Sequence, residues 1–281
     1  MTTDLKGQNI VITGSGGGLG EGYAKAAAAL GANIVVNDIN AANAEKVVKG
    51  INAAGGGKAI AAVGNIVDPL FAESMIQLCI SEFGSITDLV NNAGVFATEP
   101  IWSASLDKLR AALDVNVIGT FNCARSAVGP MMAQKSGNII NITSGAHLGM
   151  PEHGNYGASK GAVSSFTYGW AVDLAGSGVR VNCLSPMAFT PMAAHLPHLP
   201  PVEVNIPPLL FLLSKRSANL NGQVIRIVDK KLSIMAHPAN RAPVLERDQW
   251  TLDTVGDAFD ETLGALVVPT GIATYEITKI S

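Results

Sequence analysis

The sequence alternates short runs of β-branched residues with longer alanine-rich segments, and this alternation restricts the possible folds more than any other feature. Several of the runs are apolar throughout, as expected for parallel strands covered on both faces. The runs predict strands at 9–13, 33–38, 58–64, 88–94, 138–144, 179–185 and 223–229. The segments between them predict helices at 18–30, 41–54, 69–83, 104–116 continuing to about 133, 156–175 and 203–214. Repeated strand–helix–strand units indicate an α/β fold, with a parallel sheet between layers of helices.

The alternation continues without a linker or an internal repeat to about residue 231. A proline-rich stretch at 191–201 interrupts it and is typical of a loop. Beyond residue 231 the pattern fades, and only 255–266 predicts a short helix. We therefore expect one catalytic domain over 1–231. The extension over 232–281 could cap that domain, extend an oligomer interface or lie loose.

The composition argues against several classes of function. The formal net charge is −3 at pH 7, and the longest basic cluster is Lys230–Lys231, too little for a nucleic-acid footprint or a polybasic anchor. No run approaches the roughly 20 apolar residues of a membrane span, and the N-terminus lacks a signal-peptide pattern. We expect neither a nucleic acid nor a membrane as a partner.

The cysteines and histidines show no metal-ligand spacing, so no metal site is expected. The thiols at Cys79, Cys123 and Cys183 are scattered among apolar neighbours, which is typical of buried thiols in a reducing compartment. This favours a cytoplasmic protein. The imidazoles are interpreted as loop residues: His147, His153, His195, His198 and His237.

The stretch "VITGSGGGLGEG" follows the first predicted strand and opens the first predicted helix. Gly14, Gly18 and Gly20 can take positive φ or permit close backbone approach, and the helix N-terminus presents unpaired N–H groups. This arrangement suits a pyrophosphate, with Ser15 and Leu19 in the same loop. A glycine loop alone is weak evidence, but its place inside a strand–helix–strand unit favours a dinucleotide site.

Asp38 ends the second predicted strand, at the spacing expected for a residue that binds adenosine ribose. A carboxylate there can accept both ribose hydroxyls and would repel a 2′-phosphate. The alternative is that Asp38 caps the following helix. No Lys or Arg occurs at 15–17 or 39–41 to neutralise a 2′-phosphate. The expected cofactor is therefore NAD and not NADP.

Three motifs in this order, "TGSGGGLG", "NNAG" at 91–94 and "YGASK" at 156–160, resemble the short-chain dehydrogenase/reductase family over about residues 6–229. The resemblance implies a single Rossmann-type domain with a seven-stranded parallel sheet. It also implies a homodimer or homotetramer joined through helices near 104–133 and 156–175. The tetrad carried over by motif is Asn116, Ser144, Tyr156 and Lys160.

Further cofactor contacts are expected from the ends of other strands. Asn92, Ala93 and Gly94 in "NNAG" would line the cofactor site, the alternative being a strand-end turn. Asn65 and Ile66 occupy the position that is expected to contact the adenine. Many relatives have Asp where this chain has Asn65. Thr190 would bond the carboxamide or a phosphate, or else cap a helix.

Within the family, "TGSGGGLGEGYA" and "VVND" are similar to the (3R)-hydroxyacyl-CoA dehydrogenase module of multifunctional β-oxidation enzymes. Besides Asn65, two further departures from the family pattern are visible. Pro186–Met187 replaces the usual Pro-Gly after the sixth strand. Ser144 lies one residue closer to Tyr156 than expected, which leaves Thr143 as a second candidate hydroxyl.

Tyr156 and Lys160 lie four residues apart and therefore share one face of a helix. A phenol titrates near ~10, and a nearby ammonium is expected to lower that value so that Tyr156 acts as a base. Ser144 would hold the substrate oxygen, and Lys160 the nicotinamide ribose. Asn116 would position a water that relays protons, or else bond a neighbouring helical turn. For the pair itself the alternative is a solvated surface pair.

These residues favour an NAD-dependent oxidoreductase that interconverts a secondary alcohol and a ketone, with a (3R)-3-hydroxyacyl-CoA as one candidate substrate. A hydroxysteroid or another hydrophobic alcohol is the other candidate, since Phe96, Met150, Met187 and Met192 could wall an apolar pocket. Two other classes stay open on the residues alone. These are a non-catalytic NAD-binding sensor and a methyltransferase with a similar glycine loop.

Overall fold

The computed structural model describes residues 4–189, 199–268 and 270–271. The chain divides into two compact units, 1–235 and 236–281.

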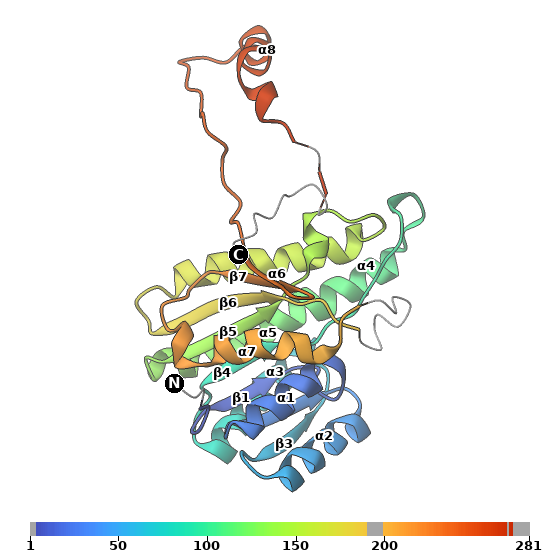
Figure 1. Cartoon of the computed structure of the whole chain (residues 1–281), viewed down its shortest axis with the longest axis vertical. Helices are drawn as coiled ribbons and strands as arrows, with labels where there is room; N and C mark the ends of the chain where they lie inside the picture. Colours follow the sequence, from blue (N-terminus) through green and yellow to red (C-terminus); the bar gives the residue numbers. More distant parts are fainter. Residues whose placement is uncertain (1–3, 190–198, 269, 272–281) are drawn as a thin grey trace. The chain divides into compact units, whose positions relative to one another are not determined.

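The predicted strands and helices of the first unit are all present, with short 3₁₀ and π segments added (Figure 1). The strands are β1 Asn9–Ile12, β2 Asn33–Asp38, β3 Ala59–Val63, β4 Asp88–Asn91, β5 Gly137–Ile142, β6 Val179–Ser185, β7 Val224–Val228 and β8 Lys231–Met235. The helices are α1 Gly18–Ala29, α2 Ala41–Ala54, α3 Pro69–Phe83, α4 Leu106–Leu113, α5 Thr120–Ala133, α6 Gly154–Asp173 and α7 Ile206–Leu213. The short segments include η1 Ile101–Ser103, the π-helical η2 Asp114–Gly119, η3 Gly145–Leu148, η5 Val202–Asn205 and η6 Lys215–Ser217.

The described strands form one sheet in the order β3-β2-β1-β4-β5-β6-β7-β8. The strands β1 to β7 are parallel, so their carboxyl ends meet at one edge of the sheet. The order reverses between β1 and β4, and α/β sheets bind ligands at such a crevice. The fold is therefore a doubly wound, Rossmann-type α/β fold, which confirms the predicted fold class.

The prediction of seven strands was one strand short. The eighth strand, β8, pairs antiparallel with β7, and a two-residue turn of Asp229 and Lys230 joins the two strands. Asp229 takes a positive φ of 52°, as tight hairpin turns require. The residues of β8 are mostly exposed and include Lys231, which suits an edge strand but weakens its apolar signal in the sequence.

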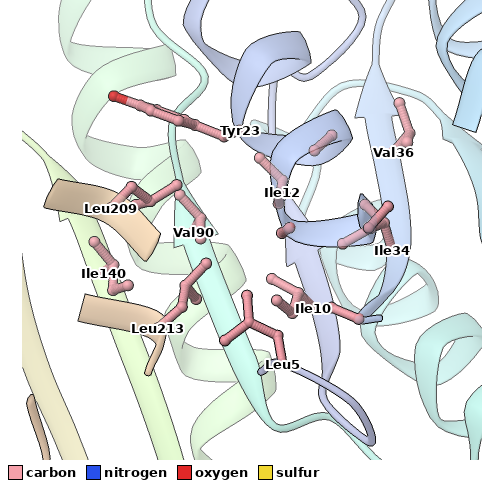
Figure 2. Packing of buried hydrophobic residues seen from close by; sticks show 14 of the residues in the cluster. Leu5, Ile10, Ile12, Tyr23, Ile34, Val36, Val90, Ile140, Leu209 and Leu213 are labelled. Carbon is pink, nitrogen blue, oxygen red and sulfur yellow. The ribbon is translucent and has the colours of Figure 1, made fainter. Parts of the chain in front are cut away.

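The core lies on both faces of the sheet because side chains alternate along each strand. On one face, Ile10 and Ile12 of β1 pack with residues of α1, α2 and α7 (Figure 2). On the other face, Val11 packs with residues of α3, α5 and the end of α6. Buried branched side chains of this kind contribute about 1.5–3 kcal/mol each. The strands are therefore fixed on both sides, which makes the carboxyl edge a rigid platform.

Among the described residues of the second unit, Leu252–Glu261 form the α-helix α8, which is followed by the 3₁₀ turn η7 Leu263–Leu266. Thr251 caps α8, since its hydroxyl accepts the Thr254 N–H and the Thr254 hydroxyl accepts the Thr251 N–H. The helix begins earlier than the predicted 255–266 segment and continues into the 3₁₀ turn. Within the described parts of both units, none of the helices combines the length and apolar character needed to cross a bilayer.

Candidate active site

The glycine loop joins β1 to α1 in a conformation that requires glycine. Gly14 and Gly18 have φ values of 60° and 56°, which other residues rarely adopt. A Cβ on Gly14 would lie 2.7 Å from the Cα of Ala93, and a Cβ on Gly20 would overlap the Gly14 carbonyl oxygen. The loop is therefore pressed against the segment after β4 and against the first turn of α1. The N-terminus of α1 faces the same loop and favours a phosphate.

Side-chain hydrogen bonds of Asn92 and Thr13 hold the glycine loop in place. The Asn92 side-chain amide donates to the carbonyl oxygens of Thr13 and Gly14, at 2.9 and 3.0 Å. The Thr13 hydroxyl accepts the N–H groups of Asn92 and Ala93, both at 3.0 Å. The "NNAG" segment therefore acts as a brace for the loop. Sequence reasoning missed Thr13, although its place directly before Gly14 was visible.

Asp38 presents its carboxylate to the glycine loop. Its Oδ2 accepts the Gly16 N–H at 3.1 Å and its Oδ1 accepts the Asn40 N–H at 2.9 Å. The residue that caps α2 is Asn40, whose side chain accepts the Asn43 N–H. Each carboxylate oxygen can accept a further hydrogen bond. This geometry leaves Asp38 suited to ribose hydroxyls, whereas the alternative role of capping α2 belongs to Asn40.

Two other predicted loop residues turn their side chains inward. Ser15 is fully buried, and its hydroxyl donates to the Ile12 carbonyl oxygen at 2.7 Å. Leu19 packs against the core beneath α1. A cofactor could therefore contact the backbone of these residues and not their side-chain ends.

The expected adenine segment after β3 is anchored to α5. Asn65 is exposed and its side-chain oxygen accepts the Val67 N–H at 3.0 Å, so its NH₂ group is the part that could meet a base. Ile66 is buried. Asn122 donates to the carbonyl oxygens of Ile66 and Val67, at 3.1 and 3.0 Å. Nothing in the sequence pointed to Asn122, because a single amide inside a helix has many possible partners.

Asn116 lies in η2, a π-helical stretch between α4 and α5, and such stretches are frequent at functional sites. Its Nδ2 donates to the Val95 carbonyl oxygen at 3.0 Å and to the Ser159 hydroxyl at 2.9 Å. Its Oδ1 accepts the Val95 N–H at 2.8 Å and retains a second lone pair. The bonds therefore reach the segment after β4 and α6 and do not stay within the neighbouring helical turn.

Gly94 separates Asn116 from Lys160. A Cβ on Gly94 would lie 3.0 Å from Asn116 Oδ1 and 3.4 Å from Lys160 Nζ. Both polar atoms thus approach the same point beside the backbone. A side chain at position 94 would crowd the space between them.

Ser144 and Thr143 have different surroundings, which separates the two candidate hydroxyls. Thr143 is buried, and its hydroxyl donates to the Lys160 carbonyl oxygen at 2.7 Å and contacts the Ser164 hydroxyl at 2.9 Å. Ser144 is partly exposed and hydrogen bonds to the Tyr156 side chain. Ser144 is therefore the hydroxyl that the structure brings to Tyr156, while Thr143 holds α6 to the sheet.

Lys160 is a buried residue and not part of a solvated surface pair. The residue is 4% exposed, and its Nζ donates to the Ile142 carbonyl oxygen at 2.8 Å. Nζ lies 5.8 Å from the centroid of the Tyr156 ring. Burial lowers the pKa of Lys160 to about 8, because the charged ammonium is poorly solvated there. The amine can therefore gain or lose a proton near neutral pH.

Tyr156 shows a different balance from the one predicted. Burial raises its pKa to about 12, and the hydrogen bond from Ser144 opposes that rise. The expected lowering by Lys160 is not found, since the ammonium lies over the ring and burial is the larger effect. Phe96 packs edge-on against the ring, with centroids 4.8 Å apart. Tyr156 therefore stays protonated at neutral pH, which is the form that donates a proton.

The departure at Pro186–Met187 is compensated by a neighbouring amide. Asn205 is fully buried, accepts the Met187 N–H at 3.1 Å and donates to the Met187 carbonyl oxygen at 2.9 Å. The chain after β6 is thus held without the usual glycine. Thr190 and Met192 lie outside the described residues.

Residues 8–198 match the protein family described as short chain dehydrogenase. The chain belongs to the short-chain dehydrogenase/reductase family. It is therefore an oxidoreductase that acts on the CH–OH group of secondary alcohols or on the matching ketones, with a nicotinamide cofactor and a small-molecule substrate. Membership decides against the sensor and the methyltransferase.

The chain is similar to a curated reductase and to a solved dehydrogenase structure. The chain is 32% identical over 240 residues to a 3-oxoacyl-[acyl-carrier-protein] reductase of Thermotoga maritima, covering 79% of this chain and 97% of that protein. The structure resembles that of a short chain dehydrogenase from Mycobacterium avium, with a TM-score of 0.81, 29% identity, and coverage of 92% and 96%. The reductase is not a β-oxidation module, so the similarity supports the family and not that particular branch.

A second solved structure bears on the cofactor. A gluconate 5-dehydrogenase from Burkholderia cenocepacia in complex with NADP and tartrate has a TM-score of 0.76 and 30% identity, covering 80% of this chain and 95% of that one. The fold therefore accommodates NADP in a similar protein, and family membership alone does not select NAD. Within the described ranges of the chain, no cluster of three or more His, Cys, Asp or Glu side chains could hold a metal ion.

Proposed function

We propose that this dehydrogenase uses NAD(H) and interconverts a 3-oxoacyl thioester and the (3R)-3-hydroxyacyl thioester. The single observation that carries the catalytic part is the contact of Ser144 with Tyr156, next to a buried Lys160 of lowered pKa. A nicotinamide bound above the glycine loop would supply the hydride chemistry. The residues of the chain supply orientation and the proton.

In the reducing direction, Tyr156 donates its hydroxyl proton to the carbonyl oxygen of the substrate. Ser144 donates a hydrogen bond to the same oxygen and keeps it in position. Lys160, which can exchange a proton near neutral pH, restores the phenol. The free lone pair of Asn116 Oδ1 would hold a water on the route from Lys160 to solvent. The protonated state of Tyr156 favours reduction at neutral pH and oxidation only at higher pH.

The preference for NAD is supported by the carboxylate of Asp38 beside the glycine loop. A 2′-phosphate at the ribose would meet this negative charge, with no Lys or Arg at 39–41 to offset it. The positive φ values at Gly14 and Gly18 and the crowded positions at Gly14 and Gly20 support a dinucleotide cradle. Asn65 and Ile66 would contact the adenine. Asn92, Ala93, Gly94 and Thr190 would line the rest of the cofactor site.

The thioester substrate is supported by the activity in the name of the Thermotoga relative. The alternative is a hydroxysteroid or a similar hydrophobic alcohol, which the aromatic ring of Phe96 beside Tyr156 favours. The two differ in charge, since a coenzyme A thioester carries phosphates and a steroid carries none.

We also propose a cytoplasmic homodimer or homotetramer. Three free buried thiols fit a reducing compartment. Phe121 on α5 is 40% exposed, and Phe166 and Trp170 of α6 stack beside it, with centroids 4.5 Å apart. A helix face with such aromatic side chains suits association with a second copy.

The test is a substrate panel followed by the absorbance of reduced nicotinamide. A 3-oxoacyl-CoA, a 3-oxoacyl pantetheine thioester and a ketosteroid are each offered with NADH and with NADPH. We expect the thioesters to be reduced, with kcat/KM for NADH at least about tenfold above that for NADPH. Reduction of the ketosteroid alone would contradict the thioester assignment, and a preference for NADPH would contradict the role of Asp38.

A further inference from the structure

Arg226 is a half-buried charged residue of β7 for which the catalytic scheme has no use. It lies on the sheet face that Val224 shares, where Val224 packs with Cys183 and Val163. Its Nη1 donates to the Ser185 hydroxyl at 2.8 Å, and Ser185 is fully buried at the end of β6. Burial lowers the pKa of Arg226, so the fold keeps this cation at a cost in solvation. A charge kept half-buried at such a cost is expected to have a structural role.

The reason is visible at Gly145, the residue that follows Ser144. A Cβ on Gly145 would overlap Nη1 of Arg226 and would lie 2.5 Å from both Cζ and Nη2. The guanidinium therefore occupies the space beside Gly145 in which a side chain would begin. Gly145 does not have a positive φ, so the space taken by Arg226, and not backbone strain, excludes a side chain there.

Arg226 thus links three neighbouring strands of the sheet. It comes from β7, it is tied to the end of β6 through Ser185, and it supports the turn after β5. The same turn carries Ser144, which caps η3 through its hydroxyl, and His147, whose Nδ1 contacts the Ser144 carbonyl oxygen at 2.5 Å. Arg226 also lowers the pKa of His147, although burial is the larger cause. Arg226 therefore acts on this turn both through its charge and through the space it fills.

We propose that Arg226 is a positioning residue that fixes the Ser144–Gly145 turn, and thereby the hydrogen bond from Ser144 to Tyr156. This rests on the proposed roles of Ser144 and Tyr156. Without the guanidinium the turn gains a space about the size of a side chain, and Ser144 is free to move away from Tyr156. Misplacement of a catalytic group by about 1 Å can cost up to about a hundredfold in rate. The tyrosine would also lose the hydrogen bond that opposes its raised pKa.

The first test is the Arg226→Ala variant, with the pH dependence of kcat for alcohol oxidation as the readout. We expect kcat to fall about tenfold, with the NADH dissociation constant within about twofold of the wild type. In alcohol oxidation kcat should rise at alkaline pH as Tyr156 loses its proton, and we call this rise the alkaline limb. Loss of the hydrogen bond from Ser144 should raise the pKa of Tyr156, so the alkaline limb should shift to higher pH by about half a unit or more, as it should in Ser144→Ala. Arg226→Lys keeps the charge but lacks the guanidinium atoms that fill the space beside Gly145, so its values should lie between those of the wild type and Arg226→Ala.

A matched control is Arg180→Ala, which removes another half-buried arginine, at the amino end of β6. It should lower the thermal midpoint without moving the alkaline limb. If Arg226→Ala leaves the limb in place, or if both variants move it equally, the positioning role is wrong.

The second test needs no substrate and measures the contact itself. Gly145→Ala should lower the thermal midpoint strongly in the wild type, but at most about half as much in the Arg226→Ala background, since the methyl group then has space. Gly161→Ala, whose Cβ would lie 3.6 Å from its nearest neighbour, serves as the control substitution. Equal losses in both backgrounds would overturn the proposal. A wild-type enzyme that reduces nothing in the panel would contradict the proposed function alone.

Discussion

Two corners of the same sheet edge are built in different ways. The glycine-loop corner, formed by Gly14–Gly20, Asp38 and Asn92, is held by hydrogen bonds to backbone groups and by positions where no side chain fits. The tetrad corner, formed by Asn116, Ser144, Tyr156 and Lys160, instead contains two groups, Tyr156 and Lys160, whose pKa values are shifted by burial. The first corner is a shape that exists before any ligand arrives. The second holds a pair of titratable side chains whose pKa values depend on burial.

Because of this difference, we expect substitutions at the two corners to affect cofactor binding and turnover separately. Changes at the glycine-loop corner should act on the dissociation constant for NADH, since they alter a shape. Changes at the tetrad corner should act on kcat, since they alter proton transfer. Lys160 is the residue expected to affect both, because it would hold the nicotinamide ribose and also exchange protons.

The largest effect is expected for Lys160→Met. Turnover should fall about a thousandfold, because the phenol loses its proton partner. The NADH dissociation constant should rise about tenfold, through loss of the ribose contact. Steady-state rates and fluorescence titration measure the two quantities. Lys25→Met, at an exposed lysine paired with Glu21, is the control and should change neither. Turnover within about threefold of the wild type would show that Lys160 has no part in proton transfer.

The next effect is expected at the glycine loop. Gly20→Ala should destabilise the chain by about 1–3 kcal/mol, because the new methyl group would overlap the Gly14 carbonyl oxygen. Denaturant unfolding measures this, and NADH affinity should fall with it. Gly17→Ala is the matched control, since its Cβ would meet nothing within 4 Å and its φ of −167° suits any residue. Equal stability of the two variants would mean that the loop is not tightly packed.

A smaller effect concerns the pH dependence of stability. Folding lowers the pKa of Lys160 to about 8, so above that pH the folded chain has released a proton that the unfolded chain still holds. The buried charge therefore destabilises the fold at neutral pH, and this destabilisation is relieved as the pH rises. Between about pH 7 and about pH 9.5, wild type should gain about 1–2 kcal/mol relative to Lys160→Met. Parallel pH profiles for the two proteins would show that Lys160 is not desolvated.

The smallest effect is expected for Asp38→Asn. The amide keeps an acceptor for the Gly16 N–H but loses the charge that opposes a 2′-phosphate. The ratio of the dissociation constants for NADPH and NADH should therefore fall about tenfold, which corresponds to about 1.4 kcal/mol. Asp68→Asn, at the exposed cap of α3, is the control. A ratio that does not change would place the ribose elsewhere.

Much of the fold could be predicted from the sequence, because the parallel strands are buried on both faces and therefore read as apolar runs. Tyr156 and Lys160 are four residues apart, so the sequence also predicts that they share one face of a helix. The sequence predicted one helix over 104–133. It did not predict the π-helical stretch that contains Asn116, because this stretch leaves no mark in the pattern of apolar residues. The edge strand β8 was missed because most of its residues face solvent.

The pKa of Tyr156 could not be predicted, because it depends on what surrounds the ring and not on which residues lie near it in the sequence. The spacing to Lys160 indicated a lowered value, whereas burial raises it. Arg226 shows the same limit. It lies 81 residues after Gly145 in the chain, and only the register of β5, β6 and β7 brings the two together. Long-range contacts of this kind leave no local pattern.

The most direct measurement is the Tyr156→Phe variant, with NADH binding and turnover determined on the same preparation. Phenylalanine keeps the ring that packs against Phe96 and removes only the hydroxyl to which we assign proton donation. We predict an NADH dissociation constant within about twofold of wild type and a turnover at least about a thousandfold lower. Turnover at the wild-type rate would contradict the assignment of proton transfer to Tyr156, and a parallel loss of NADH binding would contradict the separation of the two corners.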